Sequence, residues 1–360
     1  MTVTLIIAEA GVNHNGSEDL AFKLVDVACA AGADVVKFQT FKAEKLVTAQ
    51  ARQADYQVHN TQREESQLSM LSRLELSYES HHKLMSYCHQ SGIEFLSTAF
   101  DLTSLHFLVN ELGLSRLKIP SGELTNAPLV LEYARAGCQL ILSTGMASEA
   151  EIEAALGVIA YGLTADTTSK PSRQAFDDAY HSMAGQKALK NSVTLLHCTT
   201  EYPAPFDEIN LRAMDTMKSK FGLATGYSDH SSGISVPIAA VARGAVVIEK
   251  HFTLDKNMDG PDHKASLDPT ELSQMVKSIR EVEQALGSHQ KSPTPSELKN
   301  KDIARKSVVA AREVPKGEVF SAADLTTMRP GSGVSPYQYW EMLGRRALRH
   351  YRAGDLIVEE

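Results

Sequence analysis

Residues 5–40, LIIAEAGVNHNGSEDLAFKLVDVACAAGADVVKFQT, contain one complete strand–helix–strand unit. The runs Leu5–Gly11 and Val35–Thr40 are short and rich in branched apolar residues, which is typical of buried parallel strands. Between them, apolar residues recur at helical spacing from Glu18 to Ala31, and Gly32 follows as a C-cap. This stretch predicts a βαβ unit.

The same unit repeats along the chain. Six further runs of this kind each end in a polar or glycine-containing turn and precede a longer amphipathic segment: Glu94–Phe100, Arg116–Gly122, Gln139–Gly145, Val193–Thr200, Ala224–His230 and Val246–Leu254. Eight βα units over about 285 residues match the usual size of a TIM (β/α)8 barrel. A doubly wound open sheet is the rival, but its glycine-rich dinucleotide fingerprint is absent after the first strand. We therefore predict an α/β fold with a (β/α)8 barrel.

A small second domain is expected after the barrel. The segment 288–297, SHQKSPTPSE, is rich in proline and serine and lacks periodicity, which is typical of a linker. The predicted division is a barrel over 1–287, a linker over 288–300 and a β-rich domain over 301–360. The strand-like pieces of that domain are Lys306–Ala311, Val319–Phe320 and Asp355–Glu359. About sixty residues bury only a marginal core, so we expect this domain to lean on a barrel mouth, its own or a partner's.

Two long polar segments interrupt the βα pattern. Phe41–Leu71 follows the second strand and Ala165–Lys190 precedes the sixth. Loops of this length in a compact domain are commonly lids or covers of a site. For Ala165–Lys190 a tolerated surface insertion is an equal alternative.

Composition excludes several classes of protein. The chain has 360 residues, 43% of them hydrophobic, and a net charge of −8, which argues against a general partner of nucleic acid or anionic membrane. The N-terminus has no basic region or cleavage-like site, and no apolar run approaches the ~18 residues of a membrane span. The four cysteines are far apart in sequence, so a reducing, cytoplasmic compartment is expected.

The carboxyl ends of the predicted strands are unusually polar. In a barrel the active site is built at these ends, so their side chains are the candidates for chemistry. In chain order the ends carry Glu9, Asn13 and His14; Lys37 and Gln39; Ser97 and Thr98; Lys118, Ser121 and Glu123; Ser143 and Thr144; residues 197–202; Ser228, Asp229 and His230; and Glu249, Lys250 and His251. We predict the catalytic site at this rim.

Strand alternation brings two histidines together. If His251 points into the barrel, so does Glu249, while Lys250 points to the helices. His230 and His251 then lie on neighbouring strands at the same end of the barrel. Two imidazoles, with carboxylates and waters to complete the shell, suit a divalent metal, with Mn2+ favoured and Zn2+, Fe2+, Mg2+ or Co2+ as alternatives. Hydrogen-bonded barrel histidines are the competing interpretation, and for the pair we favour the metal.

The same rim has the composition of an anion site. Lys37 and Lys118 supply positive charge, and small hydroxyl residues and glycine amides supply donors, which together suit a phosphate group. The hydroxyl residues are Thr98, Ser121, Ser143 and Ser228, and the glycines are Gly122 and Gly145. Ion pairs for the lysines and helix caps for the hydroxyls are the alternatives. A Schiff base on Lys37 is a further one.

Motifs spread over nearly the whole chain resemble the bacterial sialic acid synthase family. They are 8–16 (AEAGVNHNG), 35–40 (VVKFQT), 118–123 (KIPSGE), 142–146 (LSTGM), 196–203 (LHCTTEYP), 226–233 (GYSDHSSG), 249–253 (EKHFT) and 260–262 (GPD). The segments 305–310 (RKSVVA) and 329–333 (RPGSG) resemble the family's antifreeze-like (SAF) domain.

The resemblance implies an enzyme that condenses phosphoenolpyruvate with an N-acylated hexosamine and releases phosphate by C–O cleavage. N-acetylmannosamine, giving N-acetylneuraminate, is the expected sugar, and a diacetamido hexose, giving N,N'-diacetyllegionaminate, is the alternative. The segment from Tyr56 to Leu76 is more similar to the neuraminate branch than to the pseudaminate branch. A Schiff-base aldolase and a non-catalytic carbohydrate- or ice-binding protein are the rivals from other classes.

The resemblance also implies roles for particular residues. His230 and His251 become the metal ligands. Contacts to phosphoenolpyruvate fall to Lys37, Thr98, Lys118, Ser121, Ser143 and Ser228. The sugar and the reacting carbons would be surrounded by Glu9, Gln39, Tyr202 and Asp262, with Thr200 also placed among the substrate contacts and with Glu9 or Glu123 steering a water. Arg329 would reach the N-acyl group from the neighbouring subunit, which predicts a domain-swapped homodimer.

Overall fold

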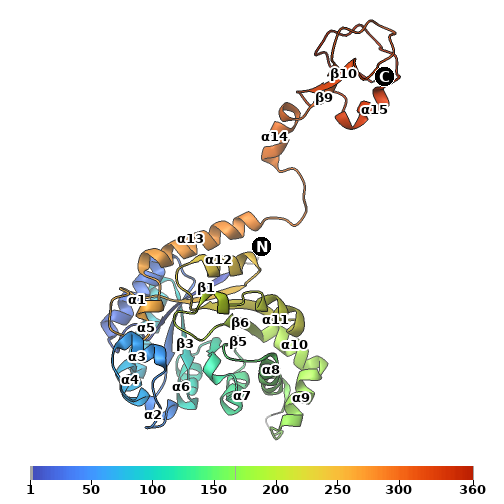
Figure 1. The fold of residues 1–360 in the computed structure, drawn as a ribbon. Coiled ribbons are helices and arrows are strands. Elements are labelled where there is room, and N and C mark those ends of the chain that lie inside the picture. Colours follow the sequence, from blue (N-terminus) through green and yellow to red (C-terminus); the bar gives the residue numbers. More distant parts are fainter. Residues whose placement is uncertain (1–2, 167, 360) are drawn as a thin grey trace. The chain divides into compact units, whose positions relative to one another are not determined.

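A computed structural model describes residues 3–166 and 168–359 and contains a closed barrel of parallel strands (Figure 1). The strands follow one another around the barrel in chain order: β1 (Leu5–Gly11), β2 (Val35–Thr40), β3 (Glu94–Ala99), β4 (Arg116–Ile119), β5 (Gln139–Ser143), β6 (Val193–Cys198), β7 (Ala224–Asp229) and β8 (Val247–His251). β8 pairs with β1 and closes the barrel. The predicted (β/α)8 barrel is confirmed.

Several predicted strands extend too far at their carboxyl ends. Ser121–Glu123, for example, is a 3-10 turn and not the end of β4. These residues are polar, and they leave the sheet to turn over the mouth of the barrel.

Helices surround the strands, as Figure 1 shows. The outer layer consists of α1 (Glu18–Ala31), α5 (Tyr78–Ser91), α6 (Leu102–His106), α7 (Ala127–Arg135), α8 (Glu149–Thr164), α11 (Ala213–Phe221), α12 (Ser235–Ala242) and α13 (Pro269–Leu286). In α1 the Ser17 side chain accepts a hydrogen bond from the Leu20 amide, and Gly32 ends the helix at a φ of 78°.

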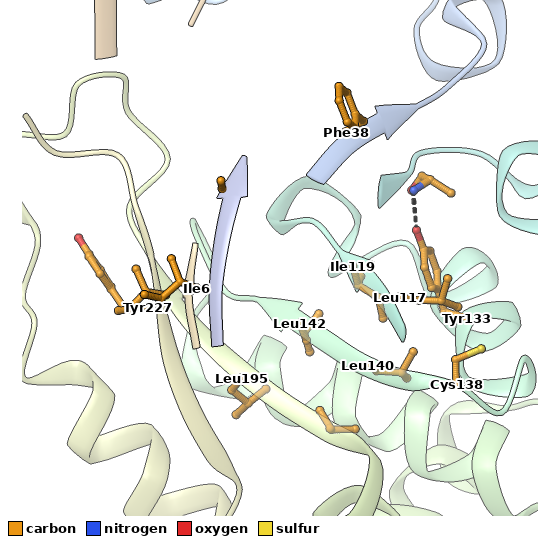
Figure 2. Packing of buried hydrophobic residues seen from close by; sticks show 14 of the residues in the cluster. Ile6, Phe38, Leu117, Ile119, Tyr133, Cys138, Leu140, Leu142, Leu195 and Tyr227 are labelled. Atoms are coloured by element: carbon orange, nitrogen blue, oxygen red, sulfur yellow. Dashed lines mark hydrogen bonds between the residues drawn. The ribbon is translucent and has the colours of Figure 1, made fainter. Parts of the chain in front are cut away.

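Two apolar layers hold the barrel together. One lies between the strands and the helices, and Figure 2 shows part of it, with Tyr227, Leu195 and Leu142 among the labelled side chains. The other fills the interior of the barrel toward the amino-terminal ends of the strands. It contains Ile7, Val35, Leu96, Ile141, Leu196 and Val247. Above this inner layer the interior becomes polar, because the next inward positions carry charges and hydroxyls.

The first long segment folds onto the mouth of the barrel. Phe41–Leu71 contains α2 (Ala43–Leu46), α3 (Asp55–Thr61) and the start of α4 (Gln67–Leu74). Phe41, Met70 and Leu74 pack with Val12 in a small separate apolar cluster. This packing agrees with the expectation of a cover.

The second long segment is not a loop. Ala165–Lys190 contains α9 (Arg173–His181) and most of α10 (Met183–Ser192), and α9 packs closely against α8. The fit is tight, because a Cβ on Gly157 would lie 2.9 Å from the carbonyl oxygen of Phe176. The segment therefore belongs to the outer helical layer, which agrees with the surface insertion and not with the lid, the two alternatives for this segment.

A second compact unit begins at Ser288. Its β9 (Ser307–Ala310) and β10 (Leu325–Met328) form an antiparallel pair over a core that includes Val308, Phe320 and Tyr351. β10 was missed in the sequence, and the predicted pieces near Val319 and Asp355 appear only as isolated bridges. The expected linker is also partly helical, since α14 (Pro295–Ala304) starts with a capping box between Thr294 and Glu297. A helix η5 (Pro336–Gln338) and α15 (Tyr339–Met342) complete the unit.

The four cysteines are free thiols. Among the described residues, no helix combines the length and the apolar character that crossing a membrane requires.

Tyr133 provides a test of how α7 is held to the barrel. Its buried hydroxyl accepts a hydrogen bond from the Ala99 amide (3.0 Å), drawn in Figure 2, and donates one to the Ala99 carbonyl (2.7 Å). Tyr133→Phe leaves both groups unpaired and should lower the free energy of unfolding by about 1–3 kcal/mol. Tyr87→Phe, which removes a surface hydrogen bond to Asp26, should change it by less than about 0.5 kcal/mol. Equal losses in urea denaturation of the two variants would contradict this account.

Candidate active site

A cavity of about 420 Å3 opens at the carboxyl ends of the strands. All of the site residues predicted from the sequence line it, except Arg329: Glu9, Lys37, Gln39, Thr98, Lys118, Ser121, Glu123, Ser143, Thr200, Tyr202, Ser228, His230, His251 and Asp262. Arg329 lies in the second unit, where it is exposed and donates a hydrogen bond to the Ala304 carbonyl (3.0 Å).

Two lysines and two glutamates form the floor of the cavity. Lys37 Nζ lies 2.8 Å from Glu9 Oε2 and 3.6 Å from Glu249 Oε2, and Lys118 Nζ lies 3.0 Å from Glu249 Oε1. None of the four side chains is more than 6% exposed. Burying four charges is tolerable because they alternate in sign and satisfy one another. We call Glu9, Lys37, Lys118 and Glu249 the charge quartet.

The two glutamates of the quartet differ in their protonation. Burial raises the pKa of Glu9 to about 7, although Lys37 opposes the shift. Burial acts in the same direction on Glu249, but Lys118 and Lys37 outweigh it and hold the pKa of that carboxyl well below its usual range. Glu249 is therefore a permanent anion, while Glu9 can exchange a proton near neutral pH.

The electrostatics of Lys37 argue against a Schiff base. Burial would lower the pKa of its ammonium group, but Glu249 and Glu9 outweigh burial and raise it. A Schiff-base lysine needs the opposite shift, because the neutral amine is the nucleophile.

Three residues with hydroxyl groups form one wall of the cavity near Gly145: Ser121, Ser143 and Thr200. We call them the hydroxyl wall. The Gly145 amide donates to Ser121 Oγ (2.9 Å). Ser143 Oγ and Thr200 Oγ1 are buried and have no hydrogen-bond partner among the described residues. Buried hydroxyls without partners are costly unless a ligand supplies them. The other two predicted hydroxyls are engaged, Thr98 with Lys37 and Ser228 with Glu249.

His230 and His251 face each other across the cavity from β7 and β8, with ring centroids 5.5 Å apart. His230 Nδ1 donates to the Thr199 carbonyl (2.6 Å), so a ligand can reach the ring only through its other nitrogen. Burial would lower the pKa of His230, but the neighbouring Cys198 outweighs burial and raises it. His251 Nδ1 is buried without a hydrogen-bond partner among the described residues. Burial, together with His230 and Lys37, holds the pKa of His251 well below its usual range, so the ring is neutral.

These features of the two histidines fit a metal. Imidazole lone pairs are the donors that divalent transition metals take. His251 is neutral and offers one, whereas the pKa of His230 is raised, so a metal would replace a proton on that ring. The described residues contain no group of three or more His, Cys, Asp or Glu side chains arranged around a single ion position. The pair would therefore share a metal with water or substrate oxygens.

Aromatic and acidic side chains form the wall beside the histidines. Tyr202 packs on His230 at 4.1 Å and on Tyr56 at 5.0 Å between ring centroids. Asp262 Oδ2 lies 4.0 Å from His251 Nδ1, and burial raises the pKa of Asp262 to about 6. His197, a further histidine at these strand ends, points outward from β6, and its Nε2 contacts the Ile209 carbonyl (2.6 Å).

Some lining residues had no role in the sequence-based site. Glu249 was placed inward by alternation, but nothing indicated that it would neutralise both lysines. The outer wall was expected only as a cover formed by Phe41–Leu71, without named contacts. It is largely apolar: Val12, Phe41, Leu46, Val47, Met70, Leu71, Leu74 and Phe100, with Tyr56 and Gln57 beside them. The helical spacing of Met70 and Leu74 was the available signal for this wall.

Together these groups define what the cavity can do. Lysines and unpaired hydroxyls can hold a small anion, and the two imidazoles can hold a cation next to it. Glu9 and Asp262 can exchange protons near neutral pH. The apolar outer wall can bind methyl groups of a second, larger ligand.

Comparison with known proteins agrees with both units. The NeuB family model matches residues 24–291, and the SAF domain model matches residues 305–360. The chain is 49% identical to N,N'-diacetyllegionaminic acid synthase of Campylobacter jejuni, over 100% of both chains. It is 44% identical to the Legionella pneumophila protein of the same name, over 99% of this chain and 93% of the other.

Two further relatives are less similar. Human N-acetylneuraminate-9-phosphate synthase is 32% identical, over 99% of this chain and 91% of the other. Among solved structures, the N-acetylneuraminic acid synthetase of Leptospira borgpetersenii in complex with citrate has a TM-score of 0.67 and 31% identity, covering 83% of this chain and 90% of the other.

Gly145 tests whether the hydroxyl wall holds an anion. A Cβ at this position would lie 2.2 Å from Thr200 Oγ1 and 2.8 Å from Ser121 Oγ, so Gly145→Ala must displace both hydroxyls. We expect this variant to bind inorganic phosphate at least about tenfold more weakly when affinity is measured by calorimetry. A tenfold loss corresponds to ~1.4 kcal/mol, which is the contribution of one good hydrogen bond.

Gly122→Ala is the matched control, because its Cβ would meet no atom within 4 Å. It should keep the fold and the phosphate affinity of the unaltered protein. Unchanged phosphate affinity in Gly145→Ala would contradict the assignment of this wall.

Proposed function

The chain belongs to the NeuB family, and from this we propose that it condenses phosphoenolpyruvate with a diacetamido hexose and water to give N,N'-diacetyllegionaminate and phosphate. Relatives at 49% and 44% identity carry the name of that synthase, whereas the N-acetylneuraminate-9-phosphate synthase is 32% identical. The diacetamido sugar, the alternative in the sequence analysis, thus replaces N-acetylmannosamine as the proposed substrate.

One observation carries the proposed chemistry. Unpaired hydroxyls and two lysines lie in the same cavity as two histidines whose ring centroids are 5.5 Å apart. Phosphoenolpyruvate needs anion donors for its phosphate and carboxylate, and in our proposal the lysines and the wall of Ser121, Ser143 and Thr200 supply them.

His230 and His251 would hold the divalent metal, for which Mn2+ remains the proposed ion and Mg2+ or Co2+ the alternatives. When bound, such an ion supplies Lewis-acid polarisation of the open-chain aldehyde of the sugar. The protein's own part is to orient C3 of phosphoenolpyruvate toward that aldehyde and to exclude bulk water. C3 forms the new C–C bond, and the aldehyde oxygen takes up the proton of Glu9, which is left as a carboxylate.

The second half of the reaction needs a base. C2 of the condensed intermediate accepts a water, and Glu9 is placed to take the proton of that water because its pKa of about 7 allows the exchange. Glu123 at the rim, which accepts a hydrogen bond from Asn126, is the second candidate. The tetrahedral adduct then breaks its C–O bond, and phosphate leaves while held by the hydroxyl wall.

The sugar would occupy the outer part of the cavity. Tyr202 and Asp262, together with Gln39, offer polar contacts there, and the apolar wall around Leu46 and Met70 suits the methyl groups of two acetamido substituents. We further propose a homodimer in which Arg329 of one subunit reaches the N-acyl group bound in the other.

A comparison of substrates tests the proposed function. Purified protein with Mn2+ and phosphoenolpyruvate should release phosphate and form a nonulosonic acid faster with a diacetamido hexose than with N-acetylmannosamine. Phosphate assay and product mass provide the readout. Preference for N-acetylmannosamine would overturn the sugar, and no phosphate release with either sugar would overturn the reaction class.

Arg329→Ala should raise KM for the sugar and leave KM for phosphoenolpyruvate unchanged.

The metal assignment makes a separate prediction. His230→Ala removes one of two imidazole ligands and should abolish both Mn2+ binding and turnover. His197→Gln, on the outward face of β6, should preserve both. Turnover by metal-stripped His230→Ala protein would contradict the role of this residue.

A further inference from the structure

A fully buried ion pair lies directly behind the two histidines. Asp229 ends β7 immediately before His230, and Lys250 precedes His251 in β8. The two residues are paired in the strand register, and Lys250 Nζ lies 2.5 Å from Asp229 Oδ2 with both side chains 0% exposed. Because side chains alternate along a strand, this pair faces the helices while both histidines face the cavity.

The same pair fixes the main chain after His230. Lys250 Nζ also donates to the Ser231 carbonyl (2.7 Å), and Asp229 Oδ1 accepts from the Ser231 amide (3.0 Å). His230 is therefore held between two residues that both bind Lys250. Lys250 of β8 therefore binds the residues on both sides of His230, Asp229 and Ser231.

Stability alone does not account for this ion pair. Buried ion pairs give little net stability, since the cost of removing the charges from water offsets their attraction, and apolar replacements of similar size are often neutral or stabilising. Ile248 and Phe252, which share this face of β8, are apolar and fully buried, and only the Tyr227 hydroxyl among these neighbours is a polar group near Asp229. An apolar pair would continue that layer.

His251 shows what the ion pair can contribute. Its Nδ1 has no hydrogen-bond partner among the described residues, so no side chain orients the ring through that atom. Its position depends on the backbone of β8 and on packing against Tyr202, whose ring centroid lies 5.6 Å away. The backbone of β8 is tied to β7 at the adjacent residue, Lys250.

We propose that Asp229 and Lys250 are positioning residues for the divalent metal: their ion pair locks β7 to β8 so that His230 and His251 keep the separation that one ion needs. This inference rests on the metal site of the proposed function. Neither residue touches the metal or the substrate, and both act through the histidines that follow them in sequence.

Mn2+ affinity, compared with folding stability, tests this role. The variant Asp229→Leu/Lys250→Met replaces both charges together and leaves neither unpaired. It also removes the hydrogen bonds to the Ser231 amide and carbonyl, so we expect it to unfold at a lower urea concentration than the metal-free original protein but to be fully folded without denaturant. Its Kd for Mn2+, titrated alone by calorimetry, should rise about 10- to 100-fold, as for other groups that orient metal ligands. At saturating Mn2+, KM for phosphoenolpyruvate should be unchanged.

Glu94→Gln/Arg116→Met is the matched control. This pair also joins neighbouring strands, β3 and β4, at 2.9 Å, but at the opposite end of the barrel. Its Mn2+ affinity should equal that of the original protein.

If the Asp229→Leu/Lys250→Met variant fails to fold, Asp229→Asn/Lys250→Gln takes its place. We expect its Kd for Mn2+ to be at least about threefold higher than that of the original protein.

The outcomes separate the two proposals. A folded Asp229/Lys250 variant with unchanged Mn2+ affinity would overturn the positioning role while leaving the proposed function intact. Absence of Mn2+ binding in the unaltered protein would overturn the metal site itself and, with it, this inference. Loss of affinity in the strand-β3/β4 control would also contradict the role, because it would show that any cross-strand pair has the effect.

Discussion

The ion pairing among Glu9, Lys37, Lys118 and Glu249 is the constraint on which the rest of the site depends. Below it the barrel interior is filled with apolar side chains, and above it lies the open cavity. Four buried charges remain there only because each has a partner of opposite sign within 3.6 Å. The quartet therefore both fills the barrel and provides the floor of the site.

An incoming anion disturbs this balance in a defined way. In the proposed reaction, phosphoenolpyruvate would bring negative charge close to both glutamates, and two anions near each other favour protonation of the more basic one. Glu249 is held charged by the two lysines, whereas Glu9 has a pKa of about 7. Protonation of Glu9 would remove the negative charge that neutralises Lys37, so the Lys37 ammonium group could bind the anionic ligand instead. Glu249 thus stays charged and holds both lysines in place, while Glu9 changes its protonation when an anion binds.

Much of this arrangement was predictable from the sequence, because strand alternation is a strict geometric rule. It placed His230 and His251 on neighbouring strands, and it directed Lys250 away from the cavity. Other features depend on packing between distant segments and have no local signature. The apolar wall around Met70 forms only when α4 packs against Val12 and Phe41, which follow β1 and β2. The helices of Ala165–Lys190 are stabilised by the surface of α8. The sharing of Glu249 between two lysines likewise depends on the exact tilt of three strands.

The fate of the bridging oxygen of phosphoenolpyruvate tests the central claim most directly. In the proposed reaction the phosphate lies against the hydroxyl wall and leaves from C2, so the C–O bond must break. With 18O in the bridging position, phosphate released in the presence of the diacetamido hexose should carry the label, and the keto acid product should not. Label retained in the product would show P–O cleavage and would contradict the account.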